Sequence, residues 1–104
     1  MALLAGLITP ARAQSPQLLA LAPLVVLAPR CGVRPPQWGQ RLDVALADAL
    51  TAEGGIADTA ALAERELATM QAWQAAPIPT CAHWRADAAT SRALARADRL
   101  LASH

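Results

Sequence analysis

Apolar residues recur at helical spacing in the middle of the chain. They fall four, seven, eight, eleven and twelve residues after Trp38, which is typical of an amphipathic helix with one buried face. Pro35–Pro36 suit the first turn of this helix, where a missing amide hydrogen costs nothing, and Gly54–Gly55 end it. The apolar face consists of Trp38, Leu42, Ala45, Leu46, Ala49 and Leu50.

Three other segments are predicted to be helical. The apolar segment Leu18–Ala28 is too short for a membrane span of roughly 20 residues, so we expect a buried first helix, although it could also belong to a longer leader. A third helix is expected from Asp58 or Thr59 to about Ala76. Pro77 and Pro79 then stop it. Its inward side would carry Leu62, Ala63, Leu67, Met70 and Trp73.

The last helix is expected to run from Thr80 or Cys81 to about Ala102. No segment alternates with period two for more than a few residues, and β-branched and aromatic residues are sparse, so no sheet is predicted. The fold class is therefore all-α, a small bundle of three to four helices. It forms a single domain over residues 14–104.

The first thirteen residues have the pattern of a secretory signal peptide. A short apolar run is followed by Ala11-Arg12-Ala13, which places small residues where a signal peptidase needs them. We therefore expect cleavage after Ala13 and export to the periplasm or outside a bacterial cell. No basic residue precedes the apolar run, so an N-terminal helix that packs on the domain is the alternative.

Cys31 and Cys81 are the two cysteines of the chain. Two cysteines in a small exported protein most simply form one disulfide. It would link the loop before the second helix to the start of the last helix, with both cysteines at helix N-terminal ends. The alternative is a reactive thiol, but no CxxC pair is present.

Composition and motifs exclude several functions. The 104 residues carry a net charge of +1, without the basic excess that nucleic-acid binding requires. No serine lies in a nucleophile-elbow sequence, no glycine-rich loop follows a strand, and no metal-ligand spacing is present. We therefore predict no catalytic residue, no cofactor and no metal.

The candidate partner-binding residues are arginines and tryptophans. Four arginines recur at helical spacing and are predicted to form a basic stripe on the last helix, which can meet an anionic partner or be only a solvated face. The tryptophans are first of all core anchors, but Trp and Arg are also enriched at binding hot spots. The candidates are Arg85, Arg92, Arg96 and Arg99 on the stripe, with Arg34, Trp38 and Trp84 beside it.

These observations predict a small exported helical protein without enzymatic activity, a binding or accessory protein of the bacterial envelope with a protein partner. One alternative is a periplasmic stress chaperone, because small acid-activated chaperones are similarly all-α with two cysteines about fifty residues apart. No specific motif supports that likeness. Another alternative is a metal or small-ligand carrier that uses Cys31, Cys81 and His83.

Overall fold

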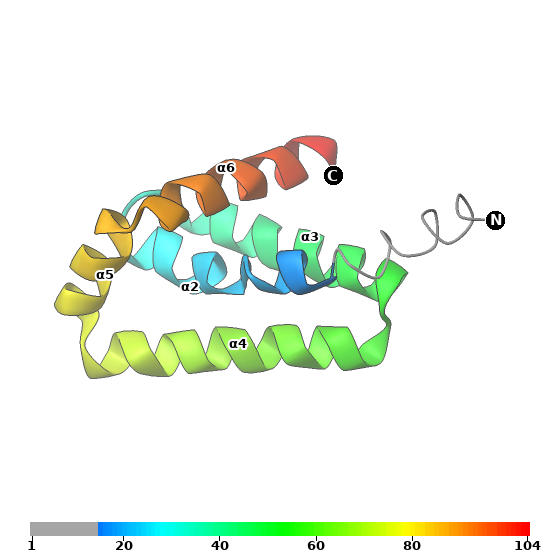
Figure 1. Ribbon diagram of the computed structural model, residues 1–104, viewed down its shortest axis with the longest axis horizontal. Coiled ribbons are helices and arrows are strands. Elements are labelled where there is room, and N and C mark those ends of the chain that lie inside the picture. Colours follow the sequence, from blue (N-terminus) through cyan, green and yellow to red (C-terminus); the bar gives the residue numbers. More distant parts are fainter. Residues whose placement is uncertain (1–14) are drawn as a thin grey trace, which may run out of the picture.

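The protein is a bundle of helices. The computed structural model describes residues 15–104, and the predicted signal peptide, residues 1–13, lies outside the described residues. No strand and no helix able to cross a membrane occur between residues 15 and 104, so the all-α prediction is confirmed. After a short helical segment at residues 15–19, the helices are α2 (Ala22–Arg30), α3 (Pro36–Glu53), α4 (Ile56–Ala75), α5 (Pro77–Ala86) and α6 (Ala88–Ser103) (Figure 1).

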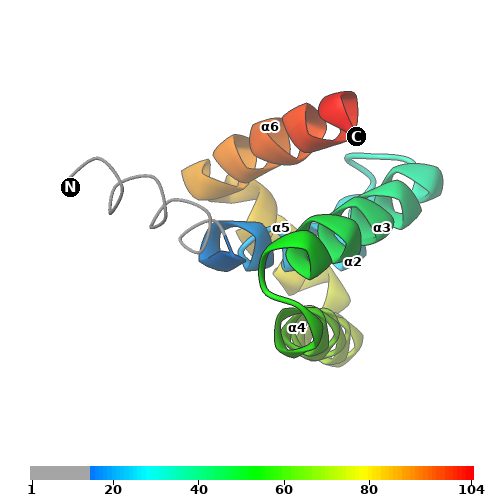
Figure 2. The same cartoon turned by 90° about the vertical axis from the view of Figure 1, so that its right-hand side faces the viewer.

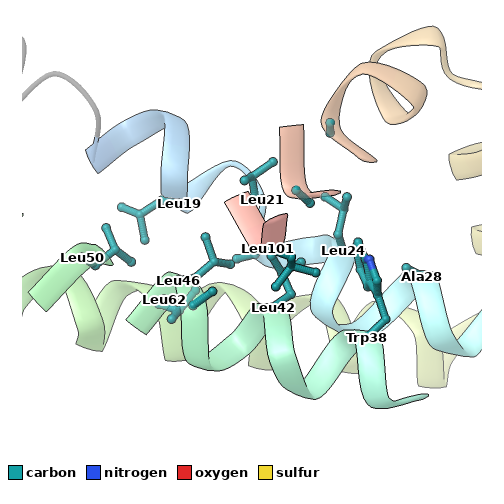
Figure 3. Close-up of a cluster of buried hydrophobic side chains, with 14 residues drawn as sticks. Leu19, Leu21, Leu24, Ala28, Trp38, Leu42, Leu46, Leu50, Leu62 and Leu101 are labelled. Atoms are coloured by element: carbon teal, nitrogen blue, oxygen red, sulfur yellow. The ribbon is translucent and has the colours of Figure 1, made fainter. Parts of the chain in front are cut away.

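The apolar segment near the N-terminus forms the centre of the bundle. Helix α2 packs against both α3 and α4, and α6 lies across the α2–α3 pair from α4 (Figure 2). The largest fully buried side chains are Leu42, Leu46 and Leu50 of α3, as the apolar spacing of that helix predicts. Leucines from four parts of the chain meet them in one cluster (Figure 3). They are Leu19, Leu21, Leu24, Leu62 and Leu101.

The prediction of three to four helices is wrong, because the C-terminal segment contains two helices. At Asp87 the backbone is extended, and its Oδ1 accepts a hydrogen bond from the Ala89 N–H at 2.9 Å, which caps α6. Thr90 Oγ1 closes the junction by donating to the Trp84 carbonyl at 2.6 Å. Pro77 does not only follow α4, since it also occupies the first turn of α5, where a proline is well tolerated.

The predicted Cys31–Cys81 disulfide is confirmed, with a Cα–Cα distance of 5.4 Å. Its predicted position is wrong, because Cys31 is the C-cap of α2 and Cys81 lies in the middle of α5 rather than at the start of the last helix. Neither cysteine is therefore at a helix N-terminus. The bond is buried in a cluster with Leu27, Trp73 and Trp84.

Helix α4 faces the bundle with only part of the side that was predicted to point inward. Leu62 enters the main core and Trp73 packs against the disulfide, and these two contacts fix the rotation of the helix. Leu67, which was expected to face inward, is consequently 55% exposed, and Ala63 is exposed as well. Glu66 takes a half-buried position on the inward side instead.

Helices α2 and α3 approach closely at Gly39. A Cβ atom at this position would lie 2.7 Å from Pro29 Cγ and 2.9 Å from the Val25 carbonyl oxygen. Proline at position 29 has no N–H to bond that carbonyl within α2. The Val25 carbonyl and the Pro29 ring therefore occupy the space that a Cβ at position 39 would need, so the crossing requires glycine.

Replacing Gly39 by alanine is predicted to destabilise the protein by about 1 to 3 kcal/mol through overpacking. The higher helix propensity of alanine acts in the opposite direction by about 1 kcal/mol. A net loss of stability would therefore show that the close approach of α2 and α3 outweighs this gain. Urea unfolding of Gly39→Ala measures it, with Gln40→Ala on the exposed neighbouring position as the control. A Gly39→Ala protein as stable as the control would contradict the close approach.

Candidate functional site

Two of the predicted binding residues are engaged inside the molecule. The indole Nε1–H of Trp38 donates to Asp98 Oδ1 at 2.8 Å, and Arg34 Nη2 donates to Asp98 Oδ2 at 2.8 Å. The Arg34 guanidinium also lies over the Trp38 ring, 5.6 Å from its centroid. We call these three residues the Asp98 latch, because they tie α6 to the start of α3.

The latch affects the titration of Asp98. The hydrogen bond from Arg34 is the largest influence and lowers the pKa of Asp98, with a further contribution from Trp38, although burial acts in the opposite direction. Trp38 itself is buried, so its N–H needs an acceptor. Asp98 lies 60 positions from Trp38, and no local sequence pattern reveals such a pair.

Three of the four predicted stripe arginines do share one exposed face. Arg92, Arg96 and Arg99 are exposed on α6, spaced four and three residues apart on the same side of the helix. None of their guanidinium groups forms an ion pair or hydrogen bond with residues 15–104. We call this surface the α6 arginine face. A shallow groove beside it is lined by Gln17, Leu18, Leu21, Arg96, Arg99 and Leu100.

Arg85 does not belong to the α6 arginine face, which corrects the predicted stripe. It lies on α5, and its Nη1 donates to the Cys31 carbonyl at 3.0 Å. The break at Asp87 separates it from the other three arginines. Trp84, also on α5, is half-buried and packs against both apolar clusters.

The residues of the predicted carrier site are not brought together as metal ligands. The sulfur atoms of Cys31 and Cys81 are bonded to each other, so neither is a thiolate. His83 is exposed and lines a separate cavity with Leu27 and Asp87. Among residues 15–104, no three His, Cys, Asp or Glu side chains are grouped as a metal would need.

A pair of carboxyl groups connects α3 and α4. Burial is the main cause that raises the pKa of Glu66 to about 8, and the neighbouring Asp43 adds to the effect. One oxygen of Glu66, Oε2, is buried without a hydrogen-bond partner in the part of the chain that the structure describes. The pair was not predicted from the sequence, because the rotation of α4 brings Glu66 toward α3.

Charge is unevenly distributed along the chain, although the whole is nearly neutral. Helices α3 and α4 contain six acidic residues against Arg41 and Arg65, whereas the rest of the described chain contains six arginines against Asp87 and Asp98. The acidic residues of α3 and α4 are Asp43, Asp48, Glu53, Asp58, Glu64 and Glu66. The arginines of the other part are Arg30, Arg34, Arg85, Arg92, Arg96 and Arg99.

Comparison with protein-family models, with curated proteins and with solved structures finds no match. No relative therefore indicates a function for this chain, and a function must be inferred from its own surfaces. Of the predicted binding residues, those of the α6 arginine face are the exposed ones that make no polar contact with the described residues.

Breaking the Asp98 latch is predicted to weaken the fold. Asp98→Ala leaves the buried Trp38 N–H without its acceptor and should lose about 2 kcal/mol. Asp98→Asn keeps an acceptor and loses only a partly exposed ion pair, about 1 kcal/mol or less. Urea unfolding at neutral pH distinguishes the two variants, and Glu64→Gln is the surface control.

The cost of Asp98→Asn should also depend on pH. A lowered pKa in the folded state contributes stability above the unfolded-state pKa, which is lost as the pH falls through the folded-state pKa. The difference between the wild type and Asp98→Asn should therefore shrink from about pH 5 toward about pH 2. An unchanged difference over this range would show that the ion pair contributes nothing.

Glu66→Gln is predicted to stabilise the protein at alkaline pH. Because the folded-state pKa is raised from 4.5 to about 8, the stabilising effect of the protonated carboxyl is complete below 4.5 and is lost as the pH rises through 8. Solvent screening of the partly exposed group limits the gain of the variant to about 1 kcal/mol. Melting curves between about pH 4 and pH 9 test this, with Glu64→Gln as the matched control. A pH-independent effect of Glu66→Gln would contradict it.

Proposed function

We propose that the protein is an exported, non-enzymatic binding protein that holds an acidic protein partner against the α6 arginine face. The observation that carries the proposal is the exposure of Arg92, Arg96 and Arg99 on one side of α6, where none of them forms an ion pair with an acidic residue in the described part of the chain. Unpaired guanidinium groups recognise carboxylates through two parallel hydrogen bonds. An acidic helix or loop can therefore pair with this face.

The charge distribution supports this orientation of binding. Of the two acidic residues outside α3 and α4, Asp87 caps α6 and Asp98 belongs to the latch. The acidic helix α4 lies across the bundle from α6 (Figure 1). A partner with an acidic surface is thus attracted to the α6 side and repelled by the α4 side.

A protein partner fits this surface better than a lipid bilayer does. An amphipathic helix that lies in a membrane must insert a free apolar face. The apolar face of α6 is already occupied, since Ala93, Ala97 and Leu101 are buried in the core. The neighbouring groove instead offers the partly exposed Leu18 and Leu100 to a single apolar side chain of a partner.

An oxidising compartment is compatible with the disulfide. We place the protein in the periplasm or outside a bacterial cell, on the basis of this bond and the predicted signal peptide. In that setting it would act as an accessory protein of the envelope.

Reversing charge on the α6 arginine face is predicted to abolish binding. Chemical cross-linking in the exported fraction should trap an acidic protein with the wild type, and Arg92→Glu/Arg96→Glu should reduce this product at least about tenfold. Arg41→Glu/Arg65→Glu makes the same charge change on α3 and α4 and should leave the product unchanged. If the Arg92 and Arg96 variant retains the partner, the face is only solvated.

A further inference from the structure

A second basic surface lies around α5, at one end of the bundle (Figure 1). A cavity of about 200 Å³ opens between the ends of α2 and α4 and the first two turns of α5. Its apolar wall consists of Trp73, Pro77, Ile78 and the Cys31–Cys81 disulfide. Ile78 is 80% exposed, so this wall is open to solvent. We call this cavity the α5 cavity.

The charged groups that line the α5 cavity are both cationic. They are Arg30, at the end of α2, and Arg85, on α5. Neither guanidinium forms an ion pair with residues 15–104. Arg85 donates one hydrogen bond, to the Cys31 carbonyl, and so keeps most of its donors free. A cavity whose described lining has two cations and no acid favours an anionic ligand.

Trp73 positions one of the two cations at the α5 cavity. The Arg30 guanidinium lies 5.3 Å from the centroid of its ring, which holds the cation at the cavity. The Trp73 Nε1–H is buried without a hydrogen-bond partner among the described residues. Because this donor is buried rather than exposed in the cavity, Trp73 contributes its contact with the Arg30 cation and its apolar ring to the site.

We propose that the α5 cavity binds a carboxylate that carries a short apolar group. The two arginines hold the carboxylate, and the apolar wall holds the rest of the ligand. The size of the cavity suits a small organic acid or the C-terminal residue of a peptide. The disulfide keeps the site assembled, because it fixes α5 beside the end of α2.

The second cavity beside α5 shows why the ligand is assigned to this one. It lies next to Trp84 and Pro79 and contains Asp87 together with His83. A carboxylate ligand would be repelled there by Asp87. The two sides of α5 thus differ in charge, and the α5 cavity is the anion-selective side.

Nuclear magnetic resonance of the ¹⁵N-labelled full chain tests the site at about neutral pH, with hexanoate as the probe. The chain has three tryptophan indoles, and the resonance of Trp73 is the one missing from Trp73→Phe. Hexanoate should shift it, while the Trp38 indole, which donates to Asp98, stays in place. Hexan-1-ol, which has a six-carbon chain of the same length without the charge, should bind about tenfold more weakly.

Variants identify the residues that hold the carboxylate. Arg30→Gln and Arg85→Gln should each raise the Kd for hexanoate about tenfold, and Arg92→Gln on the α6 arginine face should not change it. Arg30 forms no hydrogen bond within the described residues, so its replacement tests the site even if Arg85→Gln loosens α5. The control also separates this site from the proposed partner surface.

A third arm distinguishes the two sources of the carboxylate. Acetyl-Ala-Leu with a free carboxylate should bind more tightly than hexanoate if the natural ligand is a peptide C-terminus, and its amide should not bind. Tighter binding of hexanoate would assign a free organic acid. No shift of the Trp73 indole with either probe would overturn the proposal. Equal binding of hexan-1-ol and hexanoate would also overturn the proposal. So would a loss of hexanoate affinity in Arg92→Gln as large as the loss in Arg30→Gln.

Discussion

The arrangement of the helices depends on the disulfide between Cys31 and Cys81. It ties the end of the central helix α2 to α5, a short helix whose one buried residue is Cys81. Helix α5 is joined to α4 and to α6 by single residues, so its position sets where both neighbours lie. Trp73 and Trp84 pack against the bond. The apolar cluster and the two cavities at this end of the bundle therefore exist because α5 is held in place.

Elsewhere the helices are held by a leucine core and by close approach at small residues. The chain contains no Phe or Tyr, and Ala22, Ala28, Ala45 and Ala97 are fully buried between helices. Alanine contributes little apolar area, but small residues let neighbouring helices come near enough for many dispersion contacts. The glycine at the α2–α3 crossing is the extreme case. Polar contacts such as the Asp98 latch then connect α6 to a core that offers it few large side chains.

The sequence predicted what depends on local pattern and missed what depends on tertiary contact. The all-α class, the helix from Pro36 and the pairing of the cysteines follow from periodicity, end signals and cysteine count. The break at Asp87 was missed because one capping aspartate inside an alanine-rich segment is a weak signal beside continuous helical spacing. The latch and the Asp43–Glu66 pair join positions far apart in the chain, and α4 faces inward with the side that Leu62 and Trp73 select. Of the site residues, three arginines of the predicted stripe lie together, while Arg85 belongs to α5.

A bundle with so thin a core depends on its one covalent bond for much of its stability. Closing a loop of 50 residues removes conformational entropy from the unfolded chain and stabilises by about 4 kcal/mol, out of about 5 to 15 kcal/mol for a domain. Urea unfolding of the oxidised chain and of Cys31→Ala/Cys81→Ala measures this contribution directly. The variant should be about 4 kcal/mol less stable, or unfolded without urea. A loss below about 1 kcal/mol would contradict the dependence of the fold on this bond.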